Sequence, residues 1–453
     1  MNDKELAGGA AGTNGAKSLE ALYGPDGLAE ARRRYAALAE GMSPKAGFPE
    51  EFSPAGESLR AFCAPGRTEL GGNHTDHNRG KVLAASVQMD IAAVAAARGD
   101  KKIFLRSSGF QDVLVSLDDE GGRPGLSPRP EERGTTAALL RGIAAGFAAR
   151  GIEAKGFAAN VSSEIPQGSG LSSSAALEIL VAKIFDCLHG GERLSAIELA
   201  QIGQKAENDF FGKPCGLMDQ AASASGGAVA IDFADPESPL VKKIAFDPLA
   251  AGFAICAVDT QGSHADLTPD YASIPDEMLG VARFLGKSFL RETDLDAVLS
   301  RAAEIRKSLG DRALLRAIHF FNENRRAAEM AALLEELETA RDGKKRAVME
   351  RFLDLANESG DSSWELLQNM YSPSNPRDQG LCLALAASRE FFRANGLKAA
   401  CRVHGGGFAG TALAFVPVEG LDAYMARMDE LFGPGAAAIL CIRPIGAAEA
   451  ALE

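Results

Sequence analysis

A glycine- and serine-rich stretch at residues 166–176 (PQGSGLSSSAA) stands directly before an amphipathic helical pattern. From Leu177 to Leu188 apolar residues recur at the spacing of one face of an α-helix, and Gly190 ends the pattern. Small residues let backbone N–H groups approach phosphate oxygens, and a helix N-terminus favours an anion. The stretch therefore predicts a phosphate-binding loop. A serine-rich N-cap on an ordinary helix is the alternative.

This loop is not of the Walker type, because no lysine closes it. Gly286, Lys287 and Ser288 resemble the end of a Walker motif, but Val281 stands where its first glycine should be. The sequence signatures of protein kinases are also absent. Any nucleotide chemistry here therefore belongs to another class of enzyme.

The bulk composition narrows the class of partner and compartment. A chain of 453 residues, 46% apolar and 24% charged, is long enough for two or three globular domains. A net charge of −13 argues against nucleic-acid or membrane partners, so an anionic ligand needs local donors. Seven cysteines without metal-ligand spacing indicate reduced thiols. With no apolar signal segment, we expect a cytoplasmic protein. We also expect a monomer or a weak dimer.

Periodicity predicts the order of the elements along the chain. The expected helices cover residues 19–42, 135–150, 177–188, 194–209, 420–432 and, in several pieces, 275–352. The expected strands cover 83–94, 103–107, 113–116, a segment ending near 162, 253–258, 400–416 and 438–442. We expect a frayed tail at 1–17, an N-terminal domain at 18–245 and a C-terminal domain at 246–453.

Four sequence blocks occur in the order found in one known family. Residues 65–78 (PGRTELGGNHTDHN) resemble the galactokinase signature, roughly GRxNLxGEHTDYN. The serine-rich loop resembles the second motif of the wider GHMP kinase superfamily, and residues 404–410 (HGGGFAG) resemble the third. Residues 215–220 (CGLMDQ) resemble the galactokinase segment that carries the catalytic aspartate. The resemblance implies an α+β fold of two lobes, with a mixed-sheet N-terminal lobe, an antiparallel sheet and helices in the C-terminal lobe, and the active site between them.

The resemblance also implies which residues carry the chemistry. Asp219 would accept the proton of a sugar hydroxyl, early or late, and Arg67 would keep it ionised and stabilise developing negative charge. From composition alone, a buried structural ion pair would be the simpler interpretation of these two residues.

Further positions follow from the same motifs. The sugar contacts implied are Asn73, His74, Asp76, Gly216 and Tyr271. The ATP contacts implied are Gly168, Ser169, Gly170, Leu171, Ser172, Ser173, Ser174 and Ala175. Ser174 and Glu207 would hold Mg²⁺, which prefers oxygen ligands. A solvated helix residue is the alternative for Glu207, and a surface residue for Tyr271. His74 and His77 lack a third zinc ligand at suitable spacing.

The sugar signature departs from the family in three places, because Glu69 replaces an Asn, Asn73 a Glu and His77 a Tyr. The Glu normally at position 73 contacts the hydroxyl on C6 of the sugar. An amide can still bond that hydroxyl, and it no longer repels a carboxylate on C6. Galacturonate is therefore an alternative substrate, as in the related galacturonokinases, which also lack that Glu.

The function implied is ATP-dependent phosphorylation of the anomeric hydroxyl of galactose, giving α-galactose 1-phosphate and ADP. One alternative is a galacturonate 1-kinase. Another is a non-catalytic sensor of sugar and ATP, although such relatives tend to lose residues from the loop, which is intact here. A homoserine or mevalonate kinase would lack the block around His74 and Asp76.

Overall fold

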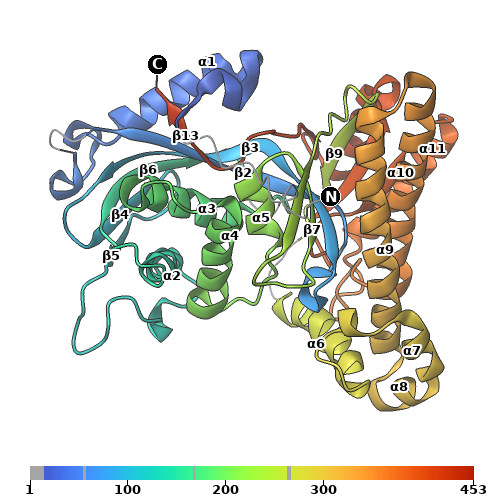
Figure 1. Ribbon diagram of the computed structural model, residues 1–453. Coiled ribbons are helices and arrows are strands. Elements are labelled where there is room, and N and C mark those ends of the chain that lie inside the picture. The colour runs from blue at the N-terminus through green and yellow to red at the C-terminus, as the bar shows by residue number, and fades with distance from the viewer. Residues whose placement is uncertain (1–14, 55–57, 167–168, 263–266, 453) are drawn as a thin grey trace, which may run out of the picture.

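Two β-sheets carry the fold of the computed structural model, which describes residues 15–54, 58–166, 169–262 and 267–452 (Figure 1). Within these residues the first sheet has nine strands, in the order β1-β13-β2-β3-β6-β4-β5, with β7 and β8 continuing from β3. Its strands are β1 (Lys17–Ser18), β2 (Arg60–Gly71), β3 (Lys81–Ala97), β4 (Lys102–Ser107), β5 (Val113–Ser116), β6 (Phe157–Ser163), β7 (Ala228–Asp232), β8 (Leu240–Ile244) and β13 (Ala448–Ala451). The sheet is mixed, because β1 pairs parallel with β13 and β4 with β6, while the other pairs are antiparallel.

Helices cover both faces of this sheet, α2 to α5 on one face and α1 on the other (Figure 1). Their bounds are α1 (Leu19–Glu40), α2 (Thr136–Ala148), α3 (Ser173–Phe185), α4 (Ala196–Lys205) and α5 (Met218–Ser225). Side chains alternate along a strand, so Ile91, Ala93 and Ala95 of β3 pack with α2 and α3, whereas Ala92 and Val94 pack with α1. This explains why the strand is apolar at nearly every position rather than at every second one.

The second sheet is antiparallel, with the order β10-β11-β9-β12. Its strands are β9 (Phe253–Asp259), β10 (Ala400–Val403), β11 (Thr411–Pro417) and β12 (Ala437–Leu440). The helices that accompany it in sequence are α6 (Thr268–Phe284), α7 (Leu295–Ser300), α8 (Ala302–Leu309), α9 (Asp311–Thr339), α10 (Asp342–Ser362), α11 (Gly380–Ala394) and α12 (Leu421–Phe432). The long helices α9 and α10 run side by side, and α9 also packs against β3 of the first sheet (Figure 1).

The α+β fold class expected from the sequence is confirmed, and most of the expected elements occur within a few residues of their expected bounds. The segment 400–416 is two strands rather than one, since the glycine block separates β10 from β11. The last strand, β13, was not expected, and it pairs with β2, so the end of the chain belongs to the first sheet. The division into domains near residue 245 stays a prediction. No described helix is both long and apolar enough to cross a membrane.

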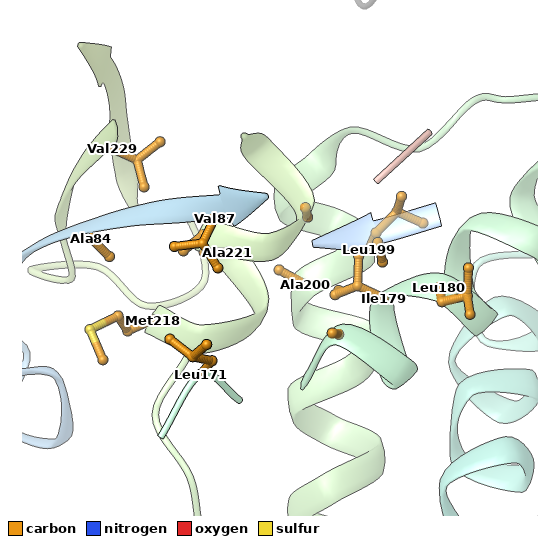
Figure 2. Close-up of a cluster of buried hydrophobic side chains, with 14 of the residues drawn as sticks. Ala84, Val87, Leu171, Ile179, Leu180, Leu199, Ala200, Met218, Ala221 and Val229 are labelled. Carbon is orange, nitrogen blue, oxygen red and sulfur yellow. The ribbon is translucent and has the colours of Figure 1, made fainter. Parts of the chain in front are cut away.

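A buried apolar cluster supports the loop and the segment that carry the candidate catalytic groups (Figure 2). Leu171 is 2% exposed and Met218 is 8% exposed, and both belong to this cluster. Each stands next in sequence to a polar residue of the site, Ser172 and Asp219. Burying a large apolar side chain stabilises by about 1.5–3 kcal/mol, so these two anchors hold their polar neighbours in place.

Candidate active site

Arg67 and Asp219 form a two-pronged ion pair that is tied to the serine-rich loop. Arg67 lies on β2, and its Nε and Nη2 each donate to one carboxylate oxygen of Asp219 at 2.7 Å. Asp219 lies in the first turn of α5 and also accepts a hydrogen bond from the hydroxyl of Ser172. The third guanidinium nitrogen, Nη1, donates to the carbonyl of Gly170, and the Arg67 backbone N–H donates to that of Leu171 at 3.0 Å. The sequence placed these groups in one site, and the structure brings them together.

The charges at this centre favour an ionised aspartate. Burial alone would raise the pKa of Asp219, but the Arg67 guanidinium and the Ser172 hydroxyl outweigh burial and hold the pKa below its ordinary value. Arg67 is 5% exposed, while the side chain of Asp219 is 31% exposed. The carboxylate is therefore charged, oriented and open to a ligand.

The loop itself turns sharply before α3. Gly170 has φ +70°, and a Cβ there would lie 2.9 Å from Nδ1 of His404, so the position requires glycine. Ser172 has φ +55°, a left-handed conformation that is uncommon outside glycine. Ser169 donates its hydroxyl to Pro166 and accepts at its carbonyl from Thr411 at 2.8 Å, which fixes the loop to β11.

The remaining loop positions follow from this geometry. Ser173, Ser174 and Ala175 form the first turn of α3, where backbone N–H groups have no partner within the helix. Ser174 is exposed and Ala175 is buried. Gly168, which was also expected to contact ATP, lies outside the described residues.

Asp76 and Gly216 meet beside the N-terminus of α5. Asp76 begins a short 3₁₀ turn (Asp76–Asn78), and its Oδ1 accepts from the backbone N–H of His77 at 2.9 Å. A Cβ at Gly216 would lie only 1.7 Å from Oδ2 of Asp76, so the backbone at residue 216 packs directly on this carboxylate. Because Gly216 stands three residues before Asp219, the sugar signature and the CGLMDQ block share one location.

The triple-glycine block joins two further candidates. The ring nitrogen Nε2 of His74 lies 3.0 Å from the carbonyl of Gly406, and the hydroxyl of Tyr271 donates to that of Gly407 at 3.0 Å. A Cβ at Gly406 would lie 2.6 Å from Cε1 of Tyr271, so this position also requires glycine. Burial and then the neighbouring His77 lower the pKa of His74 to about 3, which keeps its ring neutral at neutral pH.

Asn73 is fully buried, and its amide is occupied by the protein. Its Nδ2 donates to the carbonyl of Gly405 at 2.7 Å and contacts both carboxylate oxygens of Glu69 at 3.2 and 3.3 Å. Its Oδ1 accepts from the amide of Asn369 at 3.0 Å, and its backbone carbonyl faces His319 at 2.9 Å. Sequence reasoning missed Asn369 and His319, since neither stands in a recognisable motif.

The carboxylate that the family carries at position 73 is replaced here by one at position 69. Glu69 is 2% exposed and forms an ion pair with Nη2 of Arg402, while Nη1 of Arg402 donates to the Glu69 carbonyl at 2.8 Å. Arg402 is also fully buried. The negative charge of the signature thus lies four residues earlier in the chain than in the family, and the guanidinium of Arg402 neutralises it.

Glu207 belongs to a group of buried side chains next to Asp219. It lies in a π-helical turn (Ala206–Phe211), a feature frequent at functional sites, and is 4% exposed. Nε2 of Gln220 lies 3.0 Å from one oxygen of Glu207 and 3.0 Å from one oxygen of Glu178. The other oxygen of Glu178 is buried without a partner. Ser174 stands four residues before Glu178, on the same face of α3.

This donor set fits a hard divalent cation. The side chains of Glu178, Glu207 and Ser174 offer carboxylate and hydroxyl oxygens, which are the ligands that Mg²⁺ takes in proteins. Burial, and then the charge of Glu207, raises the pKa of Glu178 well above its ordinary value. Lys213 neutralises one oxygen of Glu207 at 3.2 Å, but Oε1 of Glu178 has no partner, and a bound cation would supply positive charge there.

Comparisons with known proteins indicate the family of this chain. The model described as GHMP kinases N terminal domain matches residues 137–227, and the one described as galactokinase galactose-binding signature matches residues 46–97. Galactokinase of Streptomyces coelicolor is 30% identical over 376 residues, which cover 82% of this chain and 88% of the relative. Galactokinase of Glaesserella parasuis is 30% identical over 378 residues, which cover 83% and 89%.

Solved structures show the same fold. The crystal structure of Lactococcus lactis galactokinase complexed with galactose matches with a TM-score of 0.71 at 24% identity, covering 89% of this chain and 99% of that one. Methanococcus jannaschii mevalonate kinase matches with a TM-score of 0.56 at 14% identity, covering 86% and 99%.

The two sheets and the loop before α3 therefore define a GHMP kinase. Within that superfamily the chain belongs to the galactokinase family. It is a sugar kinase, a transferase of phosphoryl groups.

Proposed function

We propose that the protein transfers the terminal phosphoryl group of ATP to the anomeric hydroxyl of galactose, giving α-galactose 1-phosphate and ADP. The observation that carries the proposal is the ion pair of Arg67 and Asp219, bonded to Gly170 and Ser172 of the loop before α3. A proton acceptor and a phosphate-binding turn in direct contact are what such a transfer requires.

Each group in this centre has a proposed task. Asp219, held ionised, orients the attacking hydroxyl and accepts its proton. Arg67 fixes the carboxylate and stabilises charge that develops during transfer. Backbone N–H groups of residues 169–175, at the N-terminus of α3, hold the phosphates of ATP. Ser174 and Glu207 would hold Mg²⁺, which neutralises phosphate charge when bound.

The sugar would occupy the space bordered by the signature block and the triple glycine. Asp76 can accept from two ring hydroxyls at once, with the backbone of Gly216 beside it. His74 and Tyr271, fixed on the carbonyls of Gly406 and Gly407, complete the proposed pocket. Asn73 would reach the sugar only if its amide left its present partners, so we propose that it shapes the pocket from behind.

A second candidate substrate is galacturonate, and one observation favours it. A free carboxylate at position 73 would repel a C6 carboxylate of the sugar, but Asn73 is neutral and the charge of Glu69 is paired with Arg402. The signature block therefore presents less negative charge to C6 than the family pattern does. Galactose remains the first candidate, because the relatives reported above are galactokinases.

The test is a sugar panel with ADP release as the readout. We expect ATP- and Mg²⁺-dependent turnover with galactose, slower turnover or none with glucose and mannose, and a 1-phosphate product by ³¹P NMR. A higher kcat/KM for galacturonate than for galactose would select the second candidate. If no hexose or uronic acid is turned over, the kinase proposal fails and only a sugar- and ATP-binding role is left.

A further inference from the structure

The serine-rich loop carries no lysine, and the groups around it are largely acidic. Glu178, Glu207 and Asp219 all lie at this end of the molecule, in a chain with a net charge of −13. Arg67 is only partly available to a nucleotide, because three of its five N–H donors already bond Asp219 and the Gly170 carbonyl. Binding a polyphosphate here needs another source of positive charge.

Lys213 is placed to supply that charge. Its Nζ donates to Oε1 of Glu207 at 3.2 Å, and its side chain is 60% exposed while that of Glu207 is 5% exposed. The same ammonium lies close enough to Asp219 for the two charges to stabilise each other. An ammonium has three donors and the bond to Glu207 uses one, so an exposed Lys213 has donors to offer a ligand.

The backbone fixes this lysine rather than leaving it on a loose loop. The N–H groups of Gly212 and Lys213 both donate to the carbonyl of Glu207, at 2.9 and 3.1 Å. Gly212 has φ +89°, and the N–H of Cys215 donates to Oδ1 of Asn208 at 2.7 Å. The segment between the π-helical turn and α5 is therefore tied down on both sides of Lys213.

Glu207 is held from its other side as well. Gln220, the residue after Asp219 on α5, donates to the second oxygen of Glu207 at 3.0 Å. A continuous set of bonds thus runs from Lys213 through Glu207 and Gln220 to the helix that carries the candidate base. Lys213 and Asp219 are positioned by the same short segment of chain.

We propose that Lys213 is a nucleotide-binding residue, whose ammonium donates to phosphate oxygens of the nucleotide beside Glu207. It takes the role that a lysine inside the loop plays in Walker-type proteins, but it comes from a different segment of the chain. The inference rests on the proposed use of ATP, and it adds a residue that the sequence motifs do not mark.

The experiment measures binding by calorimetry of ADP and of a non-hydrolysable ATP analogue, each with Mg²⁺ and with EDTA. Loss of one charge-assisted hydrogen bond weakens affinity about tenfold to a hundredfold, and we expect this loss in Lys213→Met under both conditions. Lys213→Arg should stay within about threefold of the wild type, because it keeps the charge. Lys205→Met, an exposed lysine on α4, is the matched control and should bind nucleotide normally.

The opposite result is equally clear. If Lys213 only neutralises Glu207 in the absence of a metal, Lys213→Met will bind the nucleotide with Mg²⁺ as tightly as the wild type and will be weakened only in EDTA, and the proposal fails. Lys213→Gln, assayed in parallel, guards against misfolding of the Met variant. Because binding is measured without sugar, a wild type that binds nucleotide but phosphorylates no sugar would refute the proposed function and leave this test readable.

Discussion

Each of three motif blocks contains a residue other than glycine in a left-handed backbone conformation. These residues are His74 (φ +57°), Ser172 (φ +55°) and Phe408 (φ +62°). A left-handed residue with a side chain costs about 1–2 kcal/mol, so surrounding contacts must hold each one. Ser172 is held by its bond to Asp219, and His74 by the carbonyl of Gly406. Strain of this kind clusters where a protein binds or reacts, which supports the placement of the site.

Asp219→Asn tests the proposed base directly. The amide cannot accept the proton, so we expect kcat to fall by about a hundredfold to ten-thousandfold. Sugar affinity, measured by calorimetry, should change little, because the amide keeps the size and one acceptor of the carboxylate. The matched control is Asp209→Asn, an exposed carboxylate in the preceding π-helical turn, which should keep normal kcat. A kcat for Asp219→Asn near that of the control would show that the base is misassigned.

At the scale of elements, β2 shows why a motif can be visible while its strand is not. All but the first of its residues are buried, so the strand lacks the alternation that predicts a half-buried strand. Its pairing with β3 also shifts register between Pro65 and Arg67 and again between Glu69 and Gly71. Bulges of this kind re-aim side chains and are frequent next to active sites. The signature in this block is therefore visible in the sequence, but the strand that presents it is not.

The contacts between motif blocks were predictable only in part. The resemblance to the galactokinase motifs identified Arg67 and Asp219, whereas the loop was recognisable from its small residues directly before a helical pattern. The burial of Asn73 depends on Asn369, which lies between elements far along the chain, and no local signal in the sequence reveals that contact. Lys213 was not predicted for a similar reason. Its contact with Glu207 forms only when the π-helical turn is folded, and no local signal in the sequence marks it.

Gly216→Ala tests whether the close contact between the backbone of Gly216 and the carboxylate of Asp76 shapes the sugar pocket. The added Cβ would lie 1.7 Å from Oδ2 of Asp76, so either the carboxylate or the start of α5 must move. If Asp76 binds the sugar, its displacement should raise the KM for the sugar about tenfold or more, with a smaller change in the KM for ATP. Gly99→Ala is the control, because a Cβ at this turn meets no atom within 4 Å. An unchanged sugar KM in Gly216→Ala would remove Asp76 from the proposed pocket.

At the scale of the whole molecule, the end of the chain returns to the first sheet. β13 covers four residues, Ala448–Ala451, of which Glu449 bonds Arg60 on β2 through both carboxylate oxygens. A strand so short and rich in alanine carries no recognisable pattern, so its pairing could not be predicted from the sequence. The long helices were predictable, because their periodic segments are longer.

The whole molecule should also lose stability in mild acid, because two buried histidines, His319 and His404, and the half-buried His74 have lowered pKa values in the folded protein. Burial lowers the pKa of His319, and burial together with the guanidiniums of Arg67 and Arg402 lowers the pKa of His404 well below its ordinary value. For His74 the pKa is about 3. An unfolded histidine takes up a proton below a pH of about 6.5, whereas the folded ones, with their lowered pKa values, take one up only in more acidic solution. The unfolded state then binds more protons, so stability falls as the pH drops below that value.

Denaturant unfolding at pH 7.5 and pH 5.0 measures this effect in the wild type and in His74→Gln. For His74 alone, pH 5 lies about 1.5 units below the unfolded pKa, which corresponds to about 2 kcal/mol of lost stability. The substitution removes that titrating group, so its destabilisation should be smaller at pH 5.0 than at pH 7.5 by about this amount. Asp219 does not contribute in this range, because its lowered pKa confines its loss of stability to more acidic solution. An equal effect of His74→Gln at the two pH values would mean that His74 is charged or exposed in the folded protein.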